Sequence, residues 1–221
     1  KDVDFNLKKG EIHALVGENG AGKSTLMKVL FGMEPPSSGE IILRGENVKF
    51  SSSKDAIAHG IGMVHQHFML VESFTAAQNI ILGMEPKKGL FVSEEEAVRF
   101  TKELSSKYNL EVEAKAVTRT LPVGVKQKIE ILKALARGAE ILILDEPTAV
   151  LTPQETEELF RQLILLKEHG HTVIFISHKI REVKQICDRI TIMKNGQSMG
   201  VYDVKDITES DISRLMVGRE V

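Results

Sequence analysis

The feature that most constrains this chain is a glycine-rich turn between an apolar run and a helical pattern. The apolar run is Ile12 to Val16, and Leu26, Met27, Val29 and Leu30 follow the turn at helical spacing. The turn itself reads Gly17, Glu18, Asn19, Gly20, Ala21, Gly22, Lys23, Ser24 and Thr25. A strand, a turn of this composition and a helix form the context that a phosphate-binding loop requires. We therefore expect an α/β fold with a phosphate site at this turn.

The residue types in the turn suit an anion. Gly20 and Gly22 accept backbone angles that a β-carbon forbids, so that successive N–H groups point at one phosphate. The positive end of the following helix adds to the attraction. Lys23 supplies a full charge for the β- and γ-phosphates, and the Ser24 hydroxyl is suited to ligate Mg²⁺. A glycine-rich turn without a ligand is the alternative, and the flanking strand and helix weigh against it.

Two acids follow a second apolar run. Asp145 and Glu146 come directly after Ile141 to Leu144, which is apolar on both faces, as a buried parallel strand should be. The carboxyl ends of such strands are where α/β sheets bind ligands. We expect Asp145 to hold the Mg²⁺ shell and Glu146 to orient and polarise an attacking water.

Two other strand ends carry candidate catalytic residues. His178 follows Val173 to Ile176, where it is placed to hydrogen-bond a γ-phosphate and to hold Glu146 and the water. Gln66 follows Ile61 to Val64 and is expected to reach Mg²⁺ or the water. An ordinary residue at a strand end is the alternative for each, and the signal from Gln66 alone is weak.

Bulk composition and spacing argue against several other classes of site. A net charge of −2 over 221 residues gives no overall basic excess of the kind that nucleic-acid binding favours. No apolar run approaches the ~20 residues of a membrane span. The single cysteine, Cys187, is expected to fill the core. A metal site at His65 and His67 is disfavoured, because alternate residues of an extended segment point to opposite sides. His169 and His171 flank a glycine and are expected in a surface turn.

Patterning also locates the sheet-forming parts. Val3, Phe5 and Leu7 alternate with polar residues and are expected to pair with 12–16 as a hairpin or bent pair of strands. Antiparallel pairs are expected at 41–43 with 48–50, and at 190–193 with 198–202.

Helical periodicity marks three consecutive segments with no strand between them. They are 76–82, capped by Thr75, then 93–108, with a Ser93–Glu96 capping signature, and 125–136. We therefore expect a helical insert over about 71–138 in an α/β domain formed by about 1–70 and 139–221. Helices at 153–169, 180–187 and 208–217 alternate with the later strands.

Taken in order, the motifs resemble those of ABC-type ATPase domains over nearly the whole chain. The specific set begins with the turn at 17–25 and Gln66, continues with the acids 145–146 followed by Pro147 and Thr148, and ends with His178. Between Gln66 and the acids lies the signature segment Leu121, Pro122, Val123, Gly124 and Val125. The resemblance implies a P-loop NTPase fold of ABC type that binds ATP and Mg²⁺. Its parts would be a mainly parallel core sheet, an antiparallel β subdomain and a helical subdomain.

Longer stretches resemble one branch, the ATPases of bacterial simple-sugar and nucleoside importers. These stretches are 17–27, 63–70, 130–135 and 148–155, and 215–220 is similar to the end of the first of their two tandem ATPase domains. The resemblance therefore implies that the chain is a fragment of a longer tandem protein. The aromatic residue that stacks on adenine in this family would lie upstream of Lys1.

The same resemblance implies partners and a mechanism. Two domains would pair head to tail, with ATP between the phosphate loop of one and the signature segment of the other. Closure would drive transmembrane permease subunits, docked near 66–71 and the helical insert, and hydrolysis would reopen the pair. The protein would lie peripherally on the cytoplasmic face of the membrane. An extracellular solute-binding protein would be an indirect partner, and nucleic acid would not be one.

Departures from the family pattern keep other functions open. Pro122 stands in place of the usual serine and Val125 in place of the usual glutamine, so a hydrogen bond to the partner's γ-phosphate should be lost. Thr152 stands where many relatives have aspartate. Asymmetric sites are therefore expected in the assembled pair. The alternatives are a nucleotide-binding regulatory half with little hydrolysis of its own and a soluble non-transport ABC-type ATPase.

Overall fold

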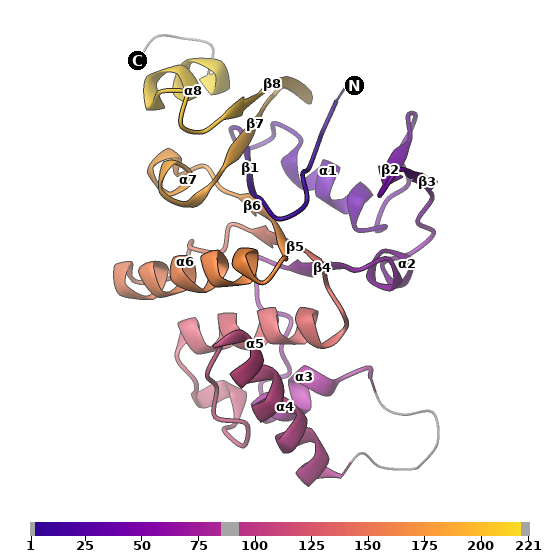
Figure 1. Cartoon of the computed structure of the whole chain (residues 1–221), viewed down its shortest axis with the longest axis vertical. Coiled ribbons are helices and arrows are strands. Elements are labelled where there is room, and N and C mark those ends of the chain that lie inside the picture. Colours follow the sequence, from indigo (N-terminus) through magenta and orange to yellow (C-terminus); the bar gives the residue numbers. More distant parts are fainter. Residues whose placement is uncertain (1–2, 85–92, 218–221) are drawn as a thin grey trace.

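The chain folds around a six-stranded sheet with the order β4-β5-β6-β1-β7-β8 (Figure 1). The computed structural model describes residues 3–84 and 93–217, so the predicted terminal stretch from 218 to 220 lies outside the described residues. The strands are β1 (Ile12–Val16), β4 (Ile61–Val64), β5 (Ile141–Asp145), β6 (Thr172–Ile176), β7 (Arg189–Lys194) and β8 (Gln197–Asp203). All neighbours run parallel except β7 and β8, which form the predicted antiparallel hairpin.

Both faces of the parallel strands are buried, which explains their unbroken apolar runs. Side chains alternate between two cores because the strand period is two. In β5, Leu142 and Leu144 contribute to the larger core and Ile143 to the smaller one. In β6, Phe175 faces the larger core and Ile174 the smaller one.

Helices cover each face of the sheet. The smaller core includes residues of α1 (Lys23–Leu30) and α2 (Ser53–Ala58), and the larger includes residues of α6 (Pro153–Glu168), α7 (Ile180–Ile186) and α8 (Glu209–Val217). A separate two-stranded antiparallel sheet pairs β2 (Ile41–Leu43) with β3 (Glu46–Val48). The predicted fold class, a mainly parallel sheet with added antiparallel strands and helices, is confirmed.

Three helices gather at one end of the molecule, below the sheet in Figure 1. They are α3 (Ala76–Ile81), α4 (Glu94–Tyr108) and α5 (Val123–Ala136), with a short 3₁₀ turn at Thr118–Thr120, and α3 packs against the other two. Thr75 and Gln78 form a reciprocal capping box at the start of α3. We propose that these helices are the helical insert expected over about 71–138, within one domain whose remainder is about 1–70 and 139–221.

The predicted pairing of residues 3–7 with β1 is wrong, because these residues form no strand. The physical reason is the position of β1 in the sheet. Its two edges already pair with β6 and β7, so no edge is free for a hairpin partner. Val3, Phe5 and Leu7 instead pack as partly buried side chains against the smaller core.

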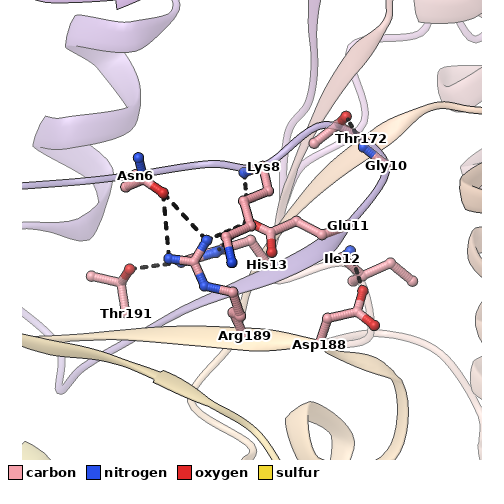
Figure 2. A network of polar contacts seen from close by, with 10 residues as sticks. All are labelled: Asn6, Lys8, Gly10, Glu11, Ile12, His13, Thr172, Asp188, Arg189 and Thr191. Carbon is pink, nitrogen blue, oxygen red and sulfur yellow. Dashed lines mark hydrogen bonds and ion pairs between the residues drawn. The ribbon is translucent and has the colours of Figure 1, made fainter.

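Polar contacts anchor this N-terminal segment where β1 begins (Figure 2). Buried Glu11 accepts hydrogen bonds from the Lys8 N–H at 2.8 Å and from Arg189 at 3.3 Å, and its Oε1 lies 2.9 Å from Nδ1 of His13. His13 is fully buried, and its Nε2 lies 2.6 Å from the Thr191 hydroxyl. Arg189 also donates to the Asn6 side chain. We call Glu11, His13 and Arg189 the Glu11 network.

Two other expectations have opposite outcomes. Cys187 is buried in the larger core, as predicted. The prediction that His171 belongs to a surface turn is wrong, because its ring packs edge-on against Tyr108 at 5.3 Å and is half-buried. That burial lowers the pKa of His171. In the described part of the chain, every helix is too short or too polar to span a membrane.

Candidate functional site

The phosphate loop connects the buried end of β1 to the first turn of α1. Gly20 and Gly22 have φ of 85° and 98°, the left-handed region that glycine enters without strain. Glu18, Asn19, Gly20, Ser24 and Thr25 are exposed, so the loop presents its backbone and the Ser24 hydroxyl to solvent. A helix N-terminus with exposed N–H groups is suited to bind a phosphate.

Lys23 lies inside this loop rather than on its surface. Only 7% of its surface is exposed, and its Nζ donates to the carbonyl oxygens of Gly17 at 2.6 Å and Glu18 at 3.1 Å. Burial lowers the pKa of Lys23, while the charges of Glu146 and Asp145 oppose the shift. The ammonium group therefore lies within electrostatic reach of both predicted acids.

Glu146 is held at the end of β5 by three separate constraints. Its φ is 48°, an uncommon value for a residue other than glycine. Its N–H donates to the Ile176 carbonyl at 3.0 Å, and its Oε1 lies 2.9 Å from Nδ1 of His178. Its buried Oε2 has no hydrogen-bond partner among the described residues. One carboxylate oxygen is thus positioned by His178 while the other is left to accept from a water or ligand.

Asp145 completes the acidic end of the sheet. Burial and the neighbouring charge of Glu146 raise its pKa, and the positive groups of His65 and Lys23 pull the pKa down. A half-buried carboxyl group in this balance favours a bound cation, which would relieve the repulsion between the two acids.

Gln66 is the next predicted site residue, and it lies at the same edge of the sheet. Gln66 is exposed just beyond β4, whose Val64 pairs with Leu144, so Gln66 lies beside the acidic end of β5. Oxygen donors from Ser24, Asp145 and Gln66 are of the type that Mg²⁺ selects. No cluster of three His, Cys, Asp or Glu able to hold a metal occurs within the described residues. A magnesium site here therefore depends on phosphate oxygens as further ligands.

The signature segment lies on a different part of the fold from the phosphate loop, at the start of a helix that packs against α6. Leu121, Pro122, Val123, Gly124 and Val125 lie at the start of α5, and the Gly124 N–H donates to Glu155 of α6 at 3.0 Å. Sequence reasoning missed Glu155, although the Thr152–Glu155 spacing is that of a capping box.

It also missed how α5 holds the loop after Gln66. Buried Glu130 accepts from the Met69 N–H at 2.5 Å, and Lys133 donates to the Met69 carbonyl at 2.8 Å. Glu130 and Lys133 lie about one helix turn apart on the same face of α5. Their spacing does not identify a loop about sixty residues earlier as the partner.

Comparison with known proteins decides the family. A family model described as "ABC transporter" matches residues 1–149. The chain belongs to the ABC transporter family. It is an ABC-type ATPase domain, and the predicted family is confirmed.

Two curated relatives of this ABC ATPase domain are named as ATP-binding proteins of nucleoside or guanosine import. The nucleoside import ATP-binding protein NupA of Lactococcus lactis is 50% identical over 99% of this chain and 43% of its own length. The guanosine import ATP-binding protein NupO of Bacillus subtilis is 50% identical over 100% of this chain and 43% of its own length. The chain thus spans less than half the length of these relatives.

A solved structure has the same fold. A dimeric bacterial ABC transporter cassette, MJ0796, superposes with a TM-score of 0.76 at 27% identity, over 92% of this chain and 90% of its own. The α/β architecture of this ABC ATPase domain is therefore that of a known cassette.

Proposed function

We propose that this chain binds and hydrolyses ATP to power an importer for a nucleoside or a simple sugar. One observation carries the proposal: the loop with buried Lys23 follows β1, and Asp145 and Glu146 lie at the end of β5, at the same carboxyl edge of a mainly parallel sheet. The 50% identity to two proteins named for nucleoside or guanosine import favours a nucleoside over a sugar.

Each residue has a role that its surroundings support. The loop at 17–25 would hold the phosphates, with Lys23 turning from the Gly17 and Glu18 carbonyls to the β- and γ-phosphates. The free Oε2 of Glu146 would accept a proton from an attacking water, while His178 keeps the carboxylate in place. Ser24, Gln66 and Asp145 would hold Mg²⁺, which supplies charge neutralisation for the phosphates.

We propose the partners on similar grounds. A second ABC domain would pair head to tail with this one, and the dimeric state of the cassette of the same fold supports the pairing of two domains. The Gly124 N–H would then face the γ-phosphate of ATP on the partner domain. Since the relatives are more than twice as long, the second domain would be part of the same tandem protein. Permease subunits would dock near 66–71, with the protein peripheral on the cytoplasmic face and an extracellular solute-binding protein as an indirect partner.

The test is Glu146→Gln in the full-length protein assembled with its permeases. Loss of the general base should lower kcat by about 10²–10⁴-fold, with ATP affinity unchanged. Glu140→Gln is the matched control, because Glu140 precedes the same strand and its exposed carboxylate pairs with Arg44. Hydrolysis by Glu146→Gln at the wild-type rate, or an equal loss in Glu140→Gln, would refute the role of Glu146. Uptake of labelled nucleosides and pentoses by the assembly would decide the solute class.

A further inference from the structure

The signature helix α5 begins without a side-chain cap of its own. Its N-cap residue is Pro122, which makes no side-chain hydrogen bond to the helix. The first N–H groups of a helix have no partner inside the helix, and serine or threonine at the N-cap normally accepts one of them. A proline at this position leaves the N–H of Gly124, the second residue of α5, in need of an acceptor from elsewhere.

Glu155 of α6 supplies that acceptor from a different helix. Its Oε1 accepts from the Gly124 N–H at 3.0 Å, and its Oε2 accepts from the Thr152 N–H at 2.9 Å. The Thr152 hydroxyl accepts in return from the Glu155 N–H at 3.2 Å. One carboxylate therefore binds the starts of both helices, through the Gly124 N–H of α5 and the Thr152 N–H at the N-cap of α6.

The Glu155 side chain approaches Gly124 closely. A β-carbon added to Gly124 would lie 2.8 Å from Oε1 of Glu155 and 3.1 Å from its Cγ. Hydrogen bonds thus direct both carboxylate oxygens, Oε1 toward the start of α5 and Oε2 toward the start of α6.

The group that binds Gly124 is an anion. The hydrogen bond from the Thr152 N–H is the largest influence on the Glu155 carboxyl, and with the Gly124 N–H it holds the pKa below the usual value. Glu155 is therefore ionised near neutral pH, and the positive end of α5 stabilises the charge. This N–H is the one for which a γ-phosphate from the partner domain would compete.

We propose that Glu155 is a positioning residue that holds the Gly124 N–H and fastens α5 to α6 until ATP on the partner domain displaces it. The inference rests on the proposed head-to-tail pairing. It predicts that the carboxylate opposes closure on ATP, so its neutralisation should strengthen ATP binding. A purely structural cap predicts the reverse, because loss of the cap would only loosen the site.

The decisive variant is Glu155→Gln in the full-length protein with its permeases. Glutamine at this position still forms a capping box with Thr152, which preserves the start of α6. Glutamine has one acceptor oxygen instead of two. Because that oxygen stays on the Thr152 N–H in the capping box, the Gly124 N–H then faces an amide nitrogen and loses its acceptor. Glu157→Gln is the matched control, since Glu157 is exposed on the same helix and its carboxylate accepts a hydrogen bond from Gln185 rather than from α5.

Steady-state hydrolysis and nucleotide competition give the first measurement. We expect Glu155→Gln to lower the KM for ATP by about three- to tenfold, the effect of removing one competing hydrogen bond of ordinary net strength. The affinity for ADP, which lacks the γ-phosphate, should stay unchanged, and Glu157→Gln should match the wild type. An unchanged or higher KM for ATP in Glu155→Gln overturns the proposal.

Hydrogen exchange of the Gly124 amide gives the second, independent measurement. Without nucleotide, exchange in Glu155→Gln should be about tenfold or more faster than in the wild type, because the protecting bond is lost. Equal exchange in the two proteins overturns the contact itself. If the wild type neither binds nor hydrolyses ATP, the proposed function fails, whereas the exchange result still decides whether Glu155 holds Gly124.

Discussion

Removal of the Glu11 carboxylate should destabilise the domain far more than removal of an exposed acid. The Glu11→Ala variant leaves fully buried His13 and mostly buried Arg189 without their shared partner. Breaking a buried charged contact by deleting one partner costs about 3–5 kcal/mol. At about 2–4 °C per kcal/mol for a domain of this size, Tm should fall by about 6–20 °C.

The loss should also depend on pH, and its sign follows from the pKa. Burial pushes the pKa of Glu11 up, but the hydrogen bonds from His13 and the Lys8 N–H, with the charges of His13 and Arg189, bring it below the usual value. A carboxyl group with a lowered folded pKa stabilises the fold above its unfolded pKa of about 4.3. That stabilisation disappears as the pH falls through the folded pKa. The difference between variant and wild type should therefore be largest near pH 7 and shrink in acid.

Calorimetry or thermal circular dichroism from pH 7 down to acid would measure this. Glu34→Ala is the control, because Glu34 pairs with Lys28 at 3.2 Å and both side chains are about half exposed. Its effect should stay within about 0.5 kcal/mol. If Glu11→Ala melts within the range of Glu34→Ala at pH 7, or if its deficit does not change with pH, the reasoning about the network is refuted.

Two further predictions concern a glycine and the cysteine. Gly32→Ala should lower the free energy of unfolding by more than about 2 kcal/mol, because φ is +70° and the new β-carbon would lie 2.5 Å from the Ser52 carbonyl oxygen. The control Gly39→Ala has φ of +88° and open space around the β-carbon, so it should cost only the ~1 kcal/mol of backbone strain. Equal losses for the two variants in urea titration would contradict the steric argument. Burial, reinforced by the charges of Asp188 and Glu182, raises the pKa of Cys187, so a thiol reagent should label it only in urea; rapid stoichiometric labelling of the native protein would show that the thiol is accessible.

Local features were readable from the sequence because neighbours along the chain create them. The strand, turn and helix around Lys23 and the helix cap at Thr75 depend on residues only a few positions apart. The acids after β5 and the histidine after β6 could be placed at one edge, because parallel strands bring their carboxyl ends together.

The features that the sequence did not predict depend on packing against elements far away along the chain. The segment at 3–7 has the alternation of a strand, but β6 and β7 already occupy both edges of β1. His171 has the flanking glycine of a turn, but Tyr108 from α4 covers its ring. Glu155 caps its own helix as its spacing indicates, but its bond to Gly124 depends on how α5 and α6 pack.

The central place of β1 has a consequence during synthesis. Ile12 pairs with Val173 and Ala14 with Ile190, so the strand that leads into Lys23 has no sheet neighbour until the last third of the chain is made. At about 5–20 residues per second, a ribosome would need roughly 8–32 s to add the ~160 residues that separate Ile12 from Val173. Throughout that interval an apolar strand with two open edges must be shielded, and a nascent chain has no assembled pocket in which to capture nucleotide.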